Sequence, residues 1–585
     1  MSSLKDLASL IMIPSLVKDG RLDTVKPLGN GIIHPDATGN NDGTDGSTPS
    51  EGNFTFSRGS NLAATRVDVN GLIEKGRENL LLQSNQFDTT WNLDGSTITG
   101  GQTGYDGSNN AWLFSKTSPF DGLNQAGLSQ SGISTTSIYA KIPSSENDVN
   151  ALLFRIQDSS GDSVVTFNLT NDTIPNLAGN AVAADKVNVG NGWYRCSLSV
   201  NATISRVNFR PAIGTSTGAS TGTLLFQDSQ LEQGLVATDY IETGASTAQS
   251  GILEDLPRLD YSGGASCPAL LLEPQRTNQC SQSEYIGSSD WNPAGITRSL
   301  VITQTSETNP EGGSICWKIQ GTASDNQLGN NSSTTSGTTI TNSIYIKRVS
   351  GTGDVFLRNV NNNHTSFSLS VADGWKRIDV TGTATSATAR FYLNLVDFND
   401  EILVWGAQQE AGSYPTSYIP TYGSAVTRSA DDVNELTSAT SLIGQSEGTL
   451  FLDFVANDED SFQIVYQVRT TGSTNVGQID FRIQSGNLRA LGNDGGANQF
   501  NISAGAVVAG TRYKCAVRYA NNDVAFYVNG VLKGSDASAS FSSSSLDQIG
   551  FNENTGSFLP SVSISQSLVF PTALTDSECI ALTTI

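Results

Sequence analysis

The feature that most constrains the fold of this chain is an ordered internal repeat within its first 430 residues. Short motifs occur twice in the same order, separated by spacers of unequal length. The paired blocks are Asn79–Ser84 and Ala269–Pro274, Ser137–Lys141 and Ser343–Lys347, Asn191–Arg195 and Asp373–Arg377, Gln230–Gly234 and Gln408–Gly412, and Asp239–Thr243 and Ser417–Thr421. A period this long indicates whole domains rather than the turns of a solenoid. The sequence therefore predicts two copies of one domain whose loops have diverged.

The composition indicates that these domains are built from short strands. Charged residues make up 15% of the 585 residues, glycine occurs 58 times, and Ser, Thr, Asn and Asp fill the stretches between apolar segments. Residues of these kinds form turns. Segments such as Ala151–Ile156 and Ala389–Leu395 have the length of strands bounded by turns, and helical periodicity is nearly absent. We therefore expect an all-β chain of tandem antiparallel sandwiches.

The ionisable residues exclude several classes of function. A net charge of −23 without clusters of Lys or Arg argues against nucleic-acid binding. Six cysteines lie far apart without metal-ligand spacing, which is typical of free thiols in a reducing cytosol. His34 and His364 are the only histidines, so Ser–His catalysis and multi-histidine zinc sites lack material. We expect no catalytic residues, no cofactor and no bound metal.

Two short sequence patterns bear on whether the chain is an enzyme. Gly214–Gly218 matches the G-x-S-x-G pattern, but a nucleophile elbow needs a helix after the serine, and a predicted strand follows instead. The E-x-D-x-x-E pattern, which places two carboxylates of a retaining glycosidase on one strand face, does not occur. Both observations favour a protein that is not an enzyme.

The N-terminal segment contains an apolar run, Leu7–Val17, which is interrupted by Pro14. It has no cleavage site of a signal peptide and is too short to span a membrane. One interpretation is a strand or short helix packed on the first domain. We favour the other, in which residues 1–30 dock into neighbouring subunits. Residues 36–52 are polar and predict a linker.

Several strings between residues 54 and 430 resemble those of a family of tailed-bacteriophage virion proteins. They are Phe54–Ser60, Ala64–Val67, Asn70–Glu74, Pro257–Tyr261, Cys267–Pro268, Leu270–Asn278, Trp405–Gly412, Pro415–Thr421 and Ala425–Arg428. Members of that family are fibre, spike and decoration components of heads and tails. In such proteins the Gly-Leu-Ile-Glu string often runs closely into Pro-Arg-Leu-Asp-Tyr. The resemblance therefore implies that residues 79–246 are an inserted, duplicated copy.

The chain from about residue 430 is similar to laminin-G and concanavalin-A-type jelly rolls. Glu447–Phe454 begins as an alternating strand, and Thr511–Tyr519 leads into Val524–Gly530, where Asn529 and Gly530 supply the positive φ angles of a hairpin turn. The predicted organisation is an N-terminal attachment segment (1–77), a first carbohydrate-binding-module-like sandwich (78–246), a connecting segment (247–269), its repeat (270–429) and the concanavalin-A-like sandwich (430–585).

A glycan site needs an aromatic ring for the apolar face of a sugar and polar groups at its rim. The tryptophans recur at matching repeat positions, as in the pairs Trp193 and Trp375, Trp91 and Trp291, and Trp112 and Trp317, which favours a shared structural role. The candidate glycan-contacting residues are therefore in the terminal domain; ordinary turn and strand positions are the alternative for them. These candidates are Asn493, Asn498, Tyr527 and Asn529.

Together these observations predict a non-enzymatic bacteriophage virion protein, made in the host cytoplasm, that acts as a tail or head fibre. We expect its terminal domain to face host surface polysaccharide. Several weak sugar sites on one assembly gain avidity, so a homotrimer is expected. The alternatives are a purely architectural decoration protein of the capsid or tail and a secreted polysaccharide-active enzyme.

Overall fold

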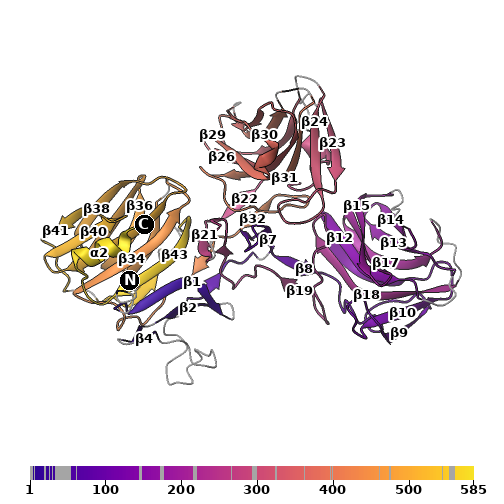
Figure 1. Ribbon diagram of the computed structural model, residues 1–585, viewed down its shortest axis with the longest axis horizontal. Coiled ribbons are helices and arrows are strands. Elements are labelled where there is room, and N and C mark those ends of the chain that lie inside the picture. Colours follow the sequence, from indigo (N-terminus) through magenta and orange to yellow (C-terminus); the bar gives the residue numbers. More distant parts are fainter. Residues whose placement is uncertain are drawn as a thin grey trace.

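The chain folds into three β-sandwiches around a central junction (Figure 1). The computed structural model describes residues 4, 7–18, 21–25, 27–28, 31–32, 54–60, 62–143, 148–171, 177–214, 221–264, 267–292, 299–322, 326–360, 363–395, 397, 399–459, 462–472, 476–542, 545–552 and 560–585. The predicted linker at residues 36–52 lies outside this part of the chain. The all-β sandwich class that the sequence predicts is confirmed.

The first sandwich, at the right of Figure 1, packs two antiparallel sheets around an apolar core. One sheet has the order β15-β16-β12-β18-β10-β9 and the other β11-β17-β13-β14. The strands are β9 (Thr97–Gln102), β10 (Ala111–Lys116), β11 (Leu123–Gln130), β12 (Ile133–Lys141), β13 (Ala151–Asp158), β14 (Gly161–Asn168), β15 (Ala181–Gly190), β16 (Trp193–Asn201), β17 (Ile204–Ala212) and β18 (Gly222–Gln233). Phe154 and Phe209 lie at the centre of the core, with their rings edge to face.

The second sandwich, at the top of Figure 1, repeats this topology. Its sheets have the orders β23-β24-β31-β26-β29 and β25-β30-β27-β28. The elements are η1 (Ser289–Trp291), β23 (Leu300–Thr305), β24 (Cys316–Gly321), β25 (Leu328–Ser333), β26 (Thr339–Ser350), β27 (Val355–Arg358), β28 (His364–Phe367), η3 (Val371–Asp373), β29 (Lys376–Thr383), β30 (Thr388–Leu395) and β31 (Glu401–Ala411). Each strand has a counterpart in the first sandwich, which adds only the edge strand β15. The two sandwiches therefore share one strand order, as the ordered repeat predicts.

The register of the first repeat block differs from the sequence-based alignment. The Asn79 side chain donates to the carbonyl oxygens of Ser229 and Ile241 at 3.1 and 2.8 Å. Asn278 donates to those of Ala407 and Ile419 at the same two distances. Asn79–Ser84 therefore corresponds to Asn278–Ser283, and the predicted match to Ala269–Pro274 was wrong, because the shared leucine run serves a different sheet.

The first and second sandwiches each have a short two-stranded ribbon at this position. In the first sandwich β8 pairs with β19, and in the second β22 pairs with β32. The ribbons are β8 (Arg77–Asn79) with β19 (Ala248–Ser250), and β22 (Arg276–Asn278) with β32 (Val426–Arg428). Both ribbons lie at the central junction (Figure 1).

Two of the three tryptophan pairs occupy equivalent positions, in which Trp91, Trp291 and Trp317 are buried and Trp112 is half-buried against the core. The indole nitrogens of Trp91 and Trp291 donate to the carbonyl oxygens of Gln83 and Gln282 at 3.0 and 2.8 Å. Trp112 and Trp317 donate to those of Asn85 and Glu284, also at 3.0 and 2.8 Å. The structural role that the repeat predicts for these four residues is confirmed.

The third pair is equivalent in position but not in burial. Trp193 is 1% exposed, whereas Trp375 is half-buried and donates to the carbonyl oxygen of Thr308 at 2.9 Å. The extra strand β15 runs beside β16, and Tyr105 packs edge-on against Trp193. The expectation that both rings are buried was wrong for Trp375, since the described part of the second sandwich has no counterpart of β15.

The terminal sandwich, at the left of Figure 1, has sheets with the orders β2-β1-β43-β34-β39-β40-β41 and β38-β37-β36-β35-β42. Its elements are β34 (Glu447–Ala456), β35 (Gln463–Arg469), β36 (Gly477–Gln484), β37 (Asn487–Asp494), β38 (Ala497–Ala506), β39 (Arg512–Ala520), β40 (Asp523–Val528), β41 (Val531–Asp536), β42 (Gln548–Gly550), β43 (Val562–Phe570) and α2 (Asp576–Thr583), joined by β1 (Leu10–Lys18) and β2 (Arg21–Val25). The turn between β40 and β41 has φ angles of 51° at Asn529 and 77° at Gly530, as expected for the Asn-Gly hairpin.

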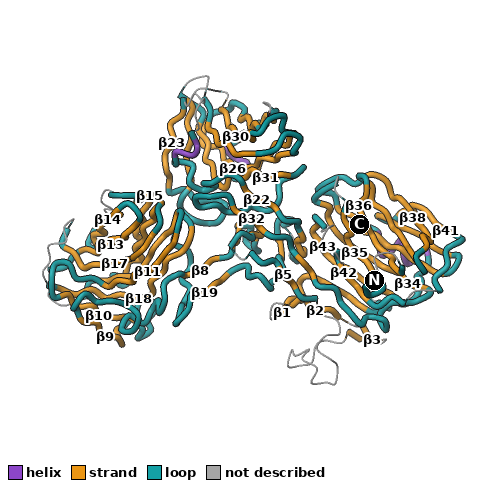
Figure 2. Tube along the Cα trace, turned by 180° about the vertical axis from the view of Figure 1, so that it is seen from behind, coloured by secondary structure: helices purple, strands orange, loops and turns teal. Residues whose placement is uncertain are grey.

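Two segments from earlier in the chain complete this sheet along one edge of β43. Ile11 of β1 pairs with Leu568, and Leu271 of β21 (Ala269–Leu272) pairs with Ser563. Figure 2 shows β1 beside β43 from behind. Leu10 and Met12 are buried in the core of the terminal sandwich. The expectation that the apolar N-terminal run is buried in a partner subunit was therefore wrong for residues 10–12, because their own chain supplies the edge.

Short strands lie in the segments that connect the sandwiches. They are β5 (Phe56–Ser57) with β33 (Asp432–Val433), β6 (Thr65–Val67) with β7 (Ile73–Lys75), and β20 (Leu259–Asp260) with β21. A further pair, β3 (Pro27–Leu28) with β4 (Gly31–Ile32), follows β2. None of the helices in the described ranges has the length and apolar composition needed to cross a membrane.

Candidate binding sites at the central junction

Five buried charged side chains form an ion network where the three sandwiches meet. The Arg258 side chain is 0% exposed and lies between Asp431, 3.0 Å from its Nε, and Glu273, 2.8 Å from its Nη1. Arg428 contacts Glu273 at 2.6 Å, and Arg58 contacts Asp431 at 3.1 Å. We call these five residues the Arg258 network. Each carboxylate has two arginine partners, which compensates the cost of removing the charges from water.

The members of this network come from four separated segments. Arg58 follows β5, Arg258 and Glu273 flank β20 and β21, and Arg428 and Asp431 lie between the second and terminal sandwiches. Ser417, from the last part of the second sandwich, donates its backbone N–H to Glu273 at 2.8 Å. The network therefore fastens the connecting segments to the junction and acts structurally.

The network makes stability depend on pH. Burial alone would raise the pKa of Glu273, but the charges of Arg428 and Arg258 outweigh it and lower the pKa from 4.5 to about 2. Because the folded carboxyl holds its proton less tightly than the unfolded one, its contribution is complete above pH 4.5 and is lost as the pH falls towards 2. We expect urea unfolding at pH 3 to show less stability than at pH 6, with Glu273 contributing at most about 3 kcal/mol.

The matched variant for this measurement is Glu273→Gln, which cannot titrate. It should be less stable than the original chain at pH 6 and should lose less stability between pH 6 and pH 3. An unchanged pH profile in the variant would show that Glu273 is not the titrating group.

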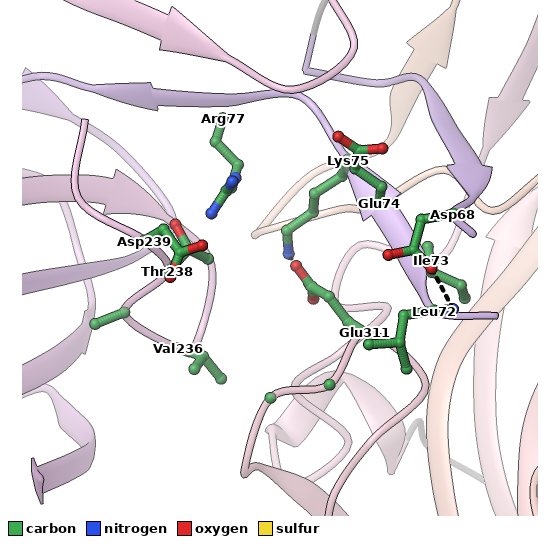
Figure 3. Close-up of a pocket in the computed structure, with 13 residues that line it drawn as sticks. Asp68, Leu72, Ile73, Glu74, Lys75, Arg77, Val236, Thr238, Asp239 and Glu311 are labelled. Atoms are coloured by element: carbon green, nitrogen blue, oxygen red, sulfur yellow. Dashed lines mark hydrogen bonds and ion pairs between the residues drawn. The ribbon is translucent and has the colours of Figure 1, made fainter. Parts of the chain in front are cut away.

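A cavity of about 370 Å³ separates the first and second sandwiches, with β7 as its third wall (Figure 3). Lys75 extends from β7 to Glu311 at 2.9 Å and Glu284 at 3.4 Å. Burial by itself lowers the pKa of Lys75, but these two carboxylates outweigh it and raise the pKa well above its ordinary value. Because nucleophilic catalysis requires a neutral amine, Lys75 serves as a buried counter-ion here.

A larger groove of about 560 Å³ lies between the second sandwich, the connecting strands and the terminal sandwich. Tyr345 of β26 and Arg377 of β29 stand side by side in it, with the guanidinium 5.4 Å from the ring centre. Arg377 also donates to the carbonyl oxygen of Thr416 at 2.7 Å and to Ser343 Oγ at 2.9 Å. Asp379 lies two residues further along β29 and therefore on the same face.

We call this whole groove the Tyr345 groove. Its opposite side is formed by residues that lie outside β26 and β29. Tyr414 packs beneath the Arg276 guanidinium, 5.5 Å away, and its hydroxyl donates to Ser561 Oγ. Asn457, which follows β34, and Asp260, the last residue of β20, complete the lining. The groove thus combines aromatic rings, amide and carboxylate groups and a fixed arginine, drawn from three parts of the chain. Sequence patterns could not bring these parts together.

The four candidate glycan residues of the terminal domain do not form one site. Asn493 and Asn498 face each other across β37 and β38, and the adjoining residues Asp494 and Gln499 accept hydrogen bonds from the 540–542 segment that follows β41. Asn529 lies at the other end of β41, in the hairpin turn, where its side chain accepts a bond from the Lys514 backbone. The structure brings together the first two of these residues only.

Tyr527 is not available to a glycan. Its side chain is 1% exposed, and its hydroxyl donates to Asp576 of α2 at 2.7 Å. The prediction for Tyr527 was wrong because α2 covers the outer face of β40. Alternation along the strand could not indicate this cover.

The remaining sequence motifs supply no catalytic set among the described residues. His364 lies in β28 with its ring 5.3 Å from that of Phe356. His34 and Ser216 lie outside the described part of the chain. No group of three or more His, Cys, Asp or Glu side chains that could hold a metal occurs within the described residues.

Comparison with known families concerns the terminal sandwich. Residues 434–579 match the family model described as the concanavalin A-like lectin/glucanases superfamily. The terminal sandwich is a concanavalin-A-like domain. The similarity to this fold that the sequence indicates is thereby confirmed for this domain, which the family model covers almost completely. No curated protein sequence matches the chain.

Solved structures show a partial likeness. The carbohydrate-binding module CBM40 of a Ruminococcus gnavus sialidase, bound to α2,3-sialyllactose, is 19% identical over 25% of this chain and 87% of its own, with a TM-score of 0.23. A leech intramolecular trans-sialidase is 18% identical over 25% and 24%, with a TM-score of 0.23. A Limulus polyphemus pentraxin is 18% identical over 24% and 70%, with a TM-score of 0.19. Each of these three structures covers about a quarter of this chain.

Proposed function

We propose that this chain is a non-enzymatic structural protein of a bacteriophage particle, a tail or head fibre that attaches to glycans on the host surface. The observation that carries the proposal is the location of the virion-like strings. Arg58, Arg258, Glu273 and Arg428 belong to those strings, and all four are members of the Arg258 network. The strings that carry the resemblance therefore include the residues that hold the three sandwiches together at the junction. For this reason we extend the resemblance to the architecture of the whole chain.

Glycan binding is supported by the folds and by the grooves they form. The concanavalin-A-like fold hosts lectins as well as hydrolases and adhesive domains, so the fold alone does not choose among them. The Tyr345 groove offers rings and polar groups of the kind that hold sugars. The scarcity of histidine and the protonated state of Lys75 support binding without chemistry.

Immunogold labelling tests the virion role. Antibodies against the terminal domain should label fibres on intact particles of the phage that encodes this chain. Labelling confined to the capsid or tail wall would favour the architectural decoration protein. Absence of the chain from purified particles would contradict the proposal.

Light scattering of the purified chain should give the molar mass of a homotrimer.

A further inference from the structure

We propose that the Tyr345 groove is a saccharide-binding site of the second sandwich and that its ligand is a neutral oligosaccharide. This inference rests on the proposed glycan attachment. It places the glycan site in a groove that the terminal domain forms only together with the second sandwich and the connecting strands. The groove volume of about 560 Å³ lies within the range of small-molecule sites, about 300–1,000 Å³.

The Tyr345 ring is held in a fixed orientation before any ligand arrives. One contact is the Arg377 guanidinium, and others are the rings of Trp405 and Tyr418, whose centres are 5.7 and 6.5 Å away and which meet Tyr345 edge to face. Tyr345 is nevertheless only half-buried and lines the groove. A fixed and accessible ring suits the apolar face of a pyranose, because little side-chain entropy is lost on binding.

The charges in the groove favour an uncharged ligand. Arg66 is paired with Glu74 at 2.7 Å, and Asp260 accepts bonds from the Val67 backbone and from Ser262. Within the described residues, the exposed Asp379 carboxylate makes no hydrogen bond or ion pair, and the charge of Arg377 on the same face acts on it. The carboxylate can accept bonds from sugar hydroxyls, and because one arginine and one carboxylate balance each other here, neither an anionic nor a cationic ligand is favoured. The recognised class is therefore a neutral, polyhydroxylated saccharide.

The first sandwich contains the same Tyr–Arg pair in a closed form. Arg195 lies 5.3 Å from the centre of the Tyr139 ring, but Tyr105 stacks on that ring at 3.9 Å with an angle of 7° between the planes. Ser197 stands where the second sandwich has Asp379, since they pair with the equivalent residues Ser137 and Ser343. The first copy thus lacks both the accessible ring and the carboxylate, and it supplies an internal control.

Saturation-transfer NMR with the full chain tests the site. The probes are maltose, cellobiose and lactose as neutral disaccharides and glucuronic acid as an anionic sugar. At least one disaccharide should bind, and Tyr345→Ala or Asp379→Asn should weaken it about tenfold or more, equivalent to 1.4 kcal/mol. Asp185→Asn, the same chemical change on β15 of the first sandwich, should leave binding unchanged.

Several results would overturn the site. The first is that none of the three disaccharides binds. The second is that glucuronic acid binds more tightly than the disaccharides, and the third is that Asp379→Asn binds as well as the original chain. Asp379 is exposed, so this variant keeps the fold, and Tyr345→Phe, which keeps the ring, should still bind. If the original chain and Asp379→Asn retain host polysaccharide equally well, the groove assignment fails while glycan attachment stands.

Discussion

Replacing Arg258 with alanine should lower the free energy of unfolding of the intact chain by about 3–5 kcal/mol. The variant leaves Asp431 and Glu273 with one arginine partner each, in a place where the Arg258 side chain is 0% exposed. Buried charge that loses its partner keeps the full cost of its removal from water. Guanidinium denaturation followed by circular dichroism measures the change.

The matched control is Arg155→Ala on β13. Arg155 pairs with Asp162 at 2.7 Å, but their side chains are 32% and 34% exposed. An exposed pair contributes at most about 1 kcal/mol, so this variant should unfold nearly like the original chain. Equal effects of the two substitutions would contradict the structural role assigned to the Arg258 network.

Residues 430–585 expressed alone should aggregate or remain partly unfolded. The isolated domain loses β1 and β21, which leaves the edge of β43 unpaired and available to other chains. It also loses six apolar side chains from its core. These are Leu10, Met12, Phe54, Phe56, Leu270 and Leu272. Each contributes about 1.5–3 kcal/mol, so the loss is on the order of 10 kcal/mol, comparable with the whole stability of a domain, about 5–15 kcal/mol.

The first sandwich provides the control for this experiment. Its main core cluster consists of residues from Leu81 to Leu231, so residues 77–250 should fold as a soluble monomer. Size-exclusion chromatography with light scattering compares the two fragments. A monomeric, cooperatively unfolding 430–585 fragment would show that β1 and β21 are dispensable.

The sequence predicted what local patterns determine. Turn residues and short apolar segments gave the all-β class, and the Asn529–Gly530 hairpin formed as its two residues require. The repeat predicted two sandwiches of one topology, yet it aligned Leu270–Leu272 with the wrong block. Leucines in a strand look alike whichever sheet they join, whereas the hydrogen bonds of Asn79 and Asn278 identify the true register.

Contacts between residues far apart in the chain could not be predicted from local sequence patterns. The pairing of Ile11 with Leu568 joins distant ends of the chain and has no local signature. Four of the five members of the Arg258 network lie in strings that carry the resemblance, but nothing in those strings indicates which arginine meets which carboxylate. The Tyr345 groove was missed for the same reason. Tyr345 and Arg377 recur in the repeat as Tyr139 and Arg195, and this recurrence could have indicated the pair. It could not have indicated that the ring is accessible in one copy and buried in the other.

Titration of the intact chain into purified polysaccharide from the host surface, followed by chromatography of that polysaccharide, tests most directly whether this protein binds glycans without chemistry. We expect saturable heat of binding and a polysaccharide whose chain length stays unchanged after prolonged incubation. Absence of binding would contradict the attachment role, and shortened polysaccharide with new reducing ends would show that the protein is an enzyme.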